Sequence, residues 1–153
     1  MDTKIDILEI LDTAVKDISK RVAKLDMLNA DSAEINTEGS SSLVSTTKGD
    51  YCLTIILYTE DRVLRAITEN MKRGVAADDA DIPIYTTEYF NILCGHVVST
   101  MNNRAHTAAR FTIPRIVKGR CEDIEPESEL KQELFYNCSY GPVKVETFYK
   151  CCS

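Results

Sequence analysis

YTTEYFNILCGHVVSTMNNRAH, residues 85–106, is the stretch that decides the fold. At 100° per residue its apolar side chains fall on one broad face, which we expect to pack inward; they are Tyr89, Phe90, Leu93, Cys94, Val97, Met101 and Ala105. A polar stripe occupies the opposite side, with Ile92 at its flank; it consists of Glu88, Asn91, Gly95, Ser99, Asn102, Asn103 and His106. The pattern predicts an amphipathic helix with one polar face.

Three members of the polar stripe are informative. A glycine inside a helix costs roughly 1 kcal/mol relative to alanine, and the usual reason for one is the close approach of another backbone, as we expect at Gly95. Glu88 and Asn91 are three positions apart, so they project side by side just before Gly95. A carboxylate can hold a cation of a partner, and an amide can hold a water molecule. We interpret the stripe as a contact surface; the alternative is an ordinary solvated face.

The chain before this helix predicts a second long helix and a hairpin. Apolar residues at spacings of three and four predict a helix over residues 3–25. A short strand is expected around residues 33–36, and Ser40, Ser41 and Ser42 indicate a bend or linker. Residues 43–47 and 51–58 are rich in β-formers and are joined by Lys48-Gly49-Asp50, which predicts a hairpin.

A further helix is expected directly after the hairpin. Thr59 offers a hydroxyl cap, Glu60 and Asp61 place acids in the first turn, and the apolar pattern runs to Gly74. Residues 75–83 then hold three aspartates without the ligand spacing of an EF-hand, so we interpret them as a solvated acidic loop.

The chain after residue 106 predicts strands. Residues 110–118 alternate as a strand, and Pro114 implies an edge position or a bulge. Two strands follow after a charged connection, residues 133–140 and 143–151, with a turn at Gly141-Pro142. The last strand alternates so that one face is expected to be buried and the other mostly wet. Residues 1–153 are therefore expected to form a single α+β domain, with long helices packed on a largely antiparallel sheet.

Charge and hydropathy exclude some classes of protein. The net charge of -6 argues against nucleic acid as a partner, because phosphate binding needs clustered Lys and Arg. The longest apolar run, residues 52–58, is far short of the roughly twenty residues of a membrane span, and the first residues lack a signal-peptide pattern. We therefore expect a soluble cytoplasmic protein.

The six cysteines are expected to be free thiols, because the cytosol is reducing. Cys138, Cys151 and Cys152 cluster near the end of the sequence, but adjacent Cys151-Cys152 is poor spacing for zinc. We therefore predict no metal site.

Two segments together resemble a known family. Residues 88–95, EYFNILCG, and residues 111–119, FTIPRIVKG, resemble the signature region of the CheX family. That family belongs with CheC and FliY, which are phosphatases of the chemotaxis response regulator CheY. The order of the expected elements is also similar, so the resemblance spans nearly the whole chain, although only these two segments are specific.

The resemblance implies a CheC-like fold and a phosphatase that adds no nucleophile of its own. Asn91 would position a water in line with the aspartyl phosphate of a CheY-like receiver, and Glu88 would contact a lysine of that receiver. The polar stripe and its flank supply the other residues expected to contact the partner, which are Gly95, Ser99, Ile92 and Asn102. No cofactor of its own is implied, since Mg²⁺ is expected on the phosphorylated receiver.

The resemblance further implies a homodimer formed through sheet contacts, with which an exposed, alternating C-terminal strand is compatible. The alternative function is a non-catalytic domain that binds a receiver or a flagellar or chemotaxis signalling protein.

The sequence departs from the family pattern before the signature helix. Ile84 stands where CheX-like helices often carry Asp or Ser, and Pro83 with Thr86-Thr87 predicts a helix start near Tyr85. Glu88 would then lie in the first turn. The preceding helix lacks the Glu-x-x-Asn pattern, since Glu69 and Asn70 are adjacent, which favours a single site per chain as in CheX.

Overall fold

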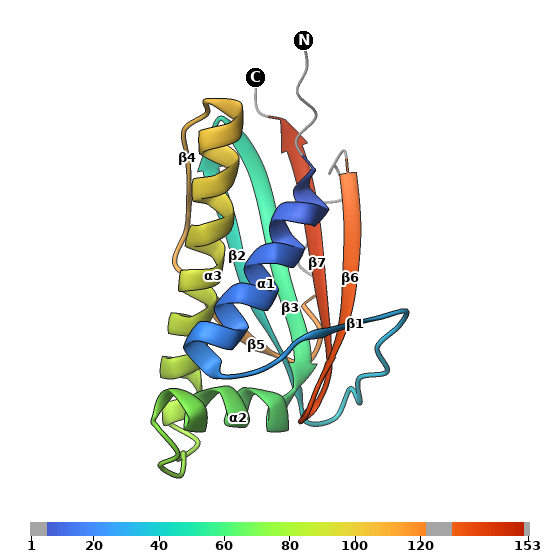
Figure 1. Ribbon diagram of the computed structural model, residues 1–153, viewed down its shortest axis with the longest axis vertical. Helices are drawn as coiled ribbons and strands as arrows, with labels where there is room; N and C mark the ends of the chain where they lie inside the picture. The colour runs from blue at the N-terminus through green and yellow to red at the C-terminus, as the bar shows by residue number, and fades with distance from the viewer. Residues whose placement is uncertain (1–5, 122–129, 152–153) are drawn as a thin grey trace.

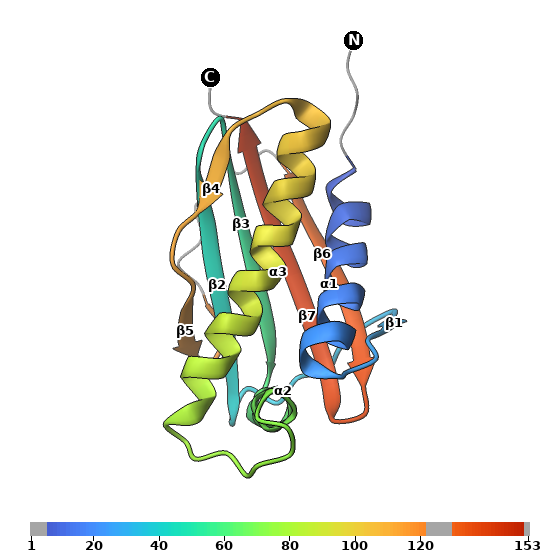
Figure 2. The same cartoon turned by 60° about the vertical axis from the view of Figure 1, so that its left-hand side comes forward.

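Helices cover one face of an antiparallel sheet in the computed structural model, which describes residues 6–121 and 130–151 (Figures 1 and 2). In that part of the chain the helices are α1 (Ile7–Ala23), α2 (Asp61–Met71) and α3 (Asp81–Ala105). The strands are β1 (Leu28–Ala30), β2 (Ser40–Gly49), β3 (Tyr51–Glu60), β4 (Ala109–Phe111), β5 (Arg115–Lys118), β6 (Leu130–Cys138) and β7 (Gly141–Cys151). The predicted α+β class is confirmed.

The sheet order places the C-terminal strand inside the sheet. The strands follow the order β1-β6-β7-β3-β2-β4, and β5 also pairs with β2. β7 therefore lies between β3 and β6, and the expectation that it is an exposed strand was wrong. The predicted hairpin is confirmed as β2 and β3, which pair from Ser40↔Glu60 to Thr46↔Thr54.

The strand predicted over residues 110–118 is divided in two. β4 ends at Phe111 and β5 begins at Arg115, and both pair with β2 at the edge of the sheet. Pro114 cannot donate to a ladder, so the chain leaves the sheet around it. The predicted edge position is confirmed, and the break brings Ile113 and Pro114 out toward α3.

Ser40, Ser41 and Ser42 are buried residues of β2 and do not form the predicted bend. Each hydroxyl is satisfied inside the fold: Ser40 donates to the Thr37 carbonyl, Ser41 to the Asp61 carboxylate and Ser42 to the Gly119 carbonyl. Buried polar groups are tolerated when they are bonded in this way. The short strand expected at residues 33–36 lies instead at Leu28–Ala30, where it pairs with β6.

The ends of the elements also differ from prediction. α1 begins after Asp6, whose carboxylate accepts the Glu9 N–H, and ends before Lys24, which adopts φ 55°; its predicted residues 3–5 lie outside the described residues. The Thr59 hydroxyl does not cap α2, because it donates to the Pro142 carbonyl. β6 ends at Cys138, so the final turn comes before Gly141, earlier than predicted.

The main core lies between the helices and the sheet. Its largest fully buried side chains come from all three helices and from the strands; they are Tyr89, Tyr136, Phe90, Leu11, Ile18, Leu43, Leu53, Ile55, Leu57, Leu64 and Ile67. The outer face of β7 was predicted to be mostly exposed to water. This was wrong, because Glu146 and Phe148 are buried there. Glu146 can be buried because three cations lie within 4 Å of its carboxylate, Arg120, Lys131 and Lys144.

Cys94, Cys121 and Cys138 are free thiols, as predicted. Burial raises the pKa of the Cys94 thiol well above its usual value, so this thiol is inert. Cys152 and most of the charged connection after Cys121 lie outside the described residues. Among the helices that are described, none is long and apolar enough to cross a membrane.

Candidate functional site

The candidate site is built on α3, which starts one turn earlier than predicted. α3 begins at Asp81, so Glu88 lies in its second turn, and the expectation of a first-turn Glu88 was wrong. Pro83 is tolerated because the first turn of a helix leaves its N–H groups unbonded. The Thr86 hydroxyl donates to the Ile82 carbonyl and the Thr87 hydroxyl to the Pro83 carbonyl, which places both threonines inside the helix.

The acidic loop before α3 is shorter than predicted, and its residues Asp78 and Asp79 are exposed, as predicted. Asp81 belongs to the helix, and its carboxylate lies 2.6 Å from the Lys72 ammonium. Asp79 lies 2.7 Å from the Arg65 guanidinium. These ion pairs tie the loop and the first residue of α3 to Arg65 of α2 and to Lys72, the C-cap residue of α2.

The two faces of α3 divide as the helical period predicted. Ala105 at the end of the predicted inward face is only half-buried. The other predicted inward residues are buried; they are Tyr89, Phe90, Leu93, Cys94, Val97 and Met101. The stripe residues are exposed with one exception; the exposed ones are Glu88, Asn91, Gly95, Ser99, Asn103 and His106. Glu88 and Asn91 therefore face solvent on one side of α3, next to Gly95.

Asn102 is the exception, because its side chain is engaged inside the fold. Its amide donates to the Ala109 carbonyl at 3.0 Å, and its oxygen accepts from the Tyr51 hydroxyl at 3.2 Å and the Thr107 hydroxyl at 3.0 Å. These bonds fasten the end of α3 to the sheet. Asn102 therefore supports the helix and offers little to a partner.

A groove joins Glu88 and Asn91 to the break between β4 and β5. Its volume is about 570 Å³, and it is lined by Ile84, Tyr85, Thr87, Glu88, Asn91, Ile113 and Pro114. The periodicity of α3 could not place Ile113 here, because the position of Ile113 depends on how the edge strands pair with β2. Its signal in the sequence is the strand-breaking Pro114. The two segments that carry the family resemblance thus meet in one groove.

The polar groups of the groove are available to a partner. Neither the Glu88 carboxylate nor the Asn91 amide makes a hydrogen bond or an ion pair with the residues that the structure describes. The apolar wall is also open, since Ile113 is 91% exposed and Ile84 is 64% exposed. An unbonded amide and carboxylate beside exposed isoleucines are typical of a surface that is completed by another molecule.

Gly95 is not explained by packing within the described chain. A Cβ atom built on Gly95 has no described atom within 4 Å, so no backbone approaches it from residues 6–121 or 130–151. A glycine at an open helical position leaves room for a partner, and that role of Gly95 stays a prediction.

A buried hydrogen bond fixes the rotation of α3 beneath the site. The Tyr89 hydroxyl and the Ser19 hydroxyl of α1 lie 2.6 Å apart, and both residues are fully buried. Burial raises the pKa of Tyr89 to about 12. With Tyr89 anchored inward, the neighbouring Glu88 points outward and Asn91 follows on the same side.

The sequence also matches a known family. The family described as "Chemotaxis phosphatase CheX" matches residues 41–137, more than half of the chain. This chain belongs to the CheX family. The matched region contains every residue of the groove, from Ile84 to Pro114, and it begins in β2, so α1 lies outside it. The resemblance seen in residues 88–95 and 111–119 is thereby confirmed.

Solved structures share the fold of this CheX family member. The chemotaxis protein CheX of Desulfovibrio desulfuricans has a TM-score of 0.79 at 14% identity, covering 95% of this chain and 100% of that chain. CheX of Vibrio vulnificus has a TM-score of 0.78 at 13% identity, covering 98% of this chain and 100% of that chain. CheX in a CheX–CheY–BeF3–Mg²⁺ complex from Borrelia burgdorferi has a TM-score of 0.72 at 15% identity, covering 96% of this chain and 99% of that chain. No curated protein matched.

Proposed function

We propose that this CheX family member hydrolyses the aspartyl phosphate of a CheY-like response regulator. The observation that carries the proposal is the pair of Glu88 and Asn91, exposed side by side on α3 in a groove where they make no bond to the described chain. The family supports a chemotaxis phosphatase. The Borrelia burgdorferi relative, which was crystallised with CheY, BeF3 and Mg²⁺, supports a receiver as the partner.

In the proposed mechanism the chain supplies positioning. The Asn91 amide holds a water in line with the phosphorus, and its neutral side chain does not compete as a nucleophile. Attack by this water forms a phosphorus–oxygen bond as the bond to the aspartyl oxygen breaks, which releases inorganic phosphate and a free carboxylate. The Glu88 carboxylate contacts a lysine of the receiver and holds the receiver in register. Mg²⁺ is expected on the receiver.

Apolar side chains around the polar pair support docking of a protein. Ile84 and Ile113 lie in the groove, and Ile92 is 38% exposed on the next turn of α3. Isoleucines that surround a polar pair exclude water from it when a partner docks, which strengthens the electrostatic contacts inside. In this arrangement Gly95 and Ser99 continue the contact surface along α3.

The test is hydrolysis of chemically phosphorylated CheY-like receivers from the same organism. Wild type should speed the loss of phosphate. Asn91→Ala should bind the receiver normally but lose roughly 100-fold or more in rate, because the water is no longer held. Glu88→Ala should mainly raise the KM. The control is Asn137→Ala, which removes an exposed amide of β6 outside the polar stripe and should leave both constants unchanged.

Two outcomes would refute this proposal. If wild type binds the receiver without accelerating hydrolysis, the alternative holds: a non-catalytic domain that binds a receiver or a flagellar or chemotaxis signalling protein. If Asn91→Ala keeps full activity, the assigned role of Asn91 is wrong. A first-turn Glu88 would have favoured the alternative, and the start of α3 at Asp81 removes that argument.

We also propose that the protein is a cytoplasmic homodimer joined through its sheet. Because β7 is internal, such a contact would use the edge formed by β1 or the edge formed by β4 and β5. Light scattering of the purified protein measures its mass, and a monomer at micromolar concentration would contradict the proposal.

A further inference from the structure

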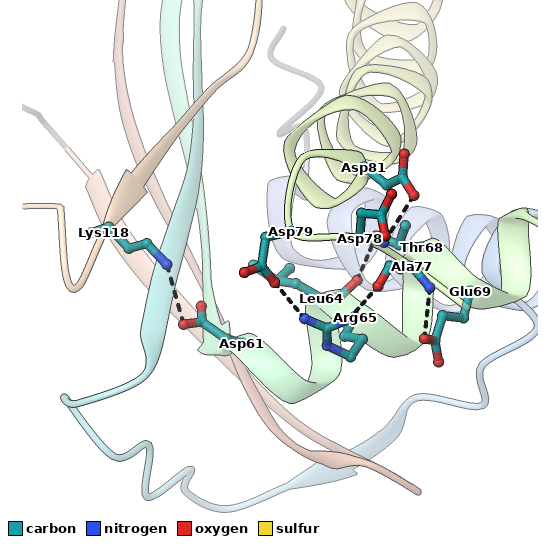
Figure 3. Close-up of polar contacts among 10 residues, drawn as sticks. All are labelled: Asp61, Leu64, Arg65, Thr68, Glu69, Ala77, Asp78, Asp79, Asp81 and Lys118. Carbon is teal, nitrogen blue, oxygen red and sulfur yellow. Dashed lines mark hydrogen bonds and ion pairs between the residues drawn. The ribbon is translucent and has the colours of Figure 1, made fainter. Parts of the chain in front are cut away.

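One face of α2 grips the loop that leads into α3. Arg65 and Glu69 of α2 and Lys72, the C-cap residue of α2, are spaced by four and three residues, so they lie on one side of the helix and its end. The Glu69 carboxylate accepts the Ala77 N–H at 3.0 Å, and Arg65 donates to the Ala77 carbonyl at 2.6 Å (Figure 3). Both polar groups of the buried Ala77 are thus bonded to α2.

The same face of α2 also reaches the first residue of α3. Lys72 donates to the Asp81 carboxylate at 2.6 Å, and that carboxylate also accepts the Asp78 N–H at 3.0 Å. The side chains of Lys72 and Asp81 are only 18% and 24% exposed, so water competes for this pair less than for a fully exposed one. The hydrogen bond raises the pKa of Lys72 and lowers the pKa of Asp81.

The residues at the start of α3 do not supply a cap of their own. The N-cap residue is Ala80, which makes no side-chain capping bond and is among the poorest residues for that position. The alanine cap leaves the beginning of the helix weakly specified by local sequence. It is held by contacts with α2 and its C-cap residue, together with the packing of Ile82 against the main core.

We propose that Arg65, Glu69 and Lys72 are positioning residues for the phosphatase site; we call this set the α2 clamp. The clamp fixes where α3 begins, and the first two turns of α3 carry Ile84, which walls the groove, and Glu88, which would hold the receiver. The effect of the clamp on activity rests on the proposed function. That the clamp holds the start of α3 is a structural statement, which does not depend on that function.

The clamp should act on docking more than on chemistry. Asn91 follows the buried pair Tyr89 and Phe90, which keep that part of α3 in place without the clamp. Ile84 precedes both that pair and the buried Thr86, so it loses its position when the start of the helix frays, and Glu88, which is next to Tyr89, is displaced less. Loss of the clamp should therefore raise the KM for the phosphorylated receiver and leave kcat nearly unchanged.

The test compares Lys72→Met, which keeps the apolar stem, with Lys72→Arg, which keeps the charge and donors. Lys72→Met should speed amide exchange in residues 81–88 and raise the KM roughly fivefold, with kcat within about twofold. Lys72→Arg should show the amide exchange and the KM of wild type. The control is Lys20→Met on α1, which removes an exposed ion pair with Asp26. Unchanged exchange in α1 shows that the variant is folded.

Unchanged exchange in residues 81–88, both in Lys72→Met and in Arg65→Met, overturns the clamp. Faster exchange with an unaltered KM overturns its effect on the site. If wild type does not hydrolyse the phosphorylated receiver, the proposed function fails, and amide exchange then decides the clamp by itself.

Discussion

Replacing Tyr89 with phenylalanine should destabilise the fold by about 2 kcal/mol. The hydroxyls of Tyr89 and Ser19 lie 2.6 Å apart and both residues are fully buried. Removal of one hydroxyl therefore leaves the other buried without this hydrogen-bond partner. A buried polar group without a partner costs about 1–3 kcal/mol, whereas removal of both partners is nearly neutral. The double variant Ser19→Ala/Tyr89→Phe should therefore be more stable than the sum of the single changes predicts.

Urea unfolding of wild type, the two single variants and the double variant measures these free energies. A loss of about 2 kcal/mol corresponds to roughly 4–8 °C in Tm for a domain of this size. Tyr140→Phe is the matched control, because Tyr140 is an exposed tyrosine and should tolerate the change. A cost below about 0.5 kcal/mol for Tyr89→Phe, or strictly additive single variants, would refute the reasoning.

The same hydroxyl predicts sensitivity to alkali. Burial raises the pKa of Tyr89 to about 12, whereas an unfolded tyrosine titrates near 10. The contribution to stability is therefore complete below about pH 10 and is lost as the pH rises toward 12. Tyr89→Phe should lose less stability than wild type between about pH 9 and pH 11. If wild type and Tyr89→Phe lose the same free energy of unfolding over this pH range, Tyr89 does not titrate in this way.

Three further substitutions test the site and its support. Gly95→Ala should stabilise α3 by about 0.5–1 kcal/mol in thermal unfolding, since its Cβ meets no described atom, yet weaken receiver binding; unchanged binding would refute the clearance role. Ile113→Asp should raise the Kd for the receiver roughly tenfold in a titration without changing Tm, because the side chain is exposed. Gly49→Ala should lower the urea midpoint by the equivalent of about 1–3 kcal/mol, because φ is +133° and the new Cβ would lie 2.5 Å from the Ala108 carbonyl oxygen; an unaltered midpoint would contradict the strain.

The elements with strong periodicity could be predicted from the sequence. The inward face of α3 and the pairing of β2 with β3 follow from local patterns of apolar residues, and both were found as expected. The start of α3 was missed, because it depends on the contact of Asp81 with Lys72, the C-cap residue of α2. The serines of β2 were misread for a similar reason, since the partners that satisfy Ser41 and Ser42 lie far along the chain.

The candidate site was predicted in part. The spacing of Glu88 and Asn91 was enough to place them side by side on a helix, because a helix repeats every 3.6 residues. Asn102 falls on the same stripe by that period, but local spacing could not show that Tyr51 and Ala109 occupy it. Ile113 entered the groove through the pairing of edge strands, which no local pattern records.

The break between β4 and β5 has a consequence for how this protein behaves at high concentration. An open sheet edge can recruit a strand from another molecule, and a long regular edge is the strongest template for aggregation. Here the outer side of β2 is met by strands of three and four residues, separated by a segment that contains Pro114. An incoming strand would therefore find only short runs of free backbone groups. The residues that wall the groove thus also protect the sheet from uncontrolled association.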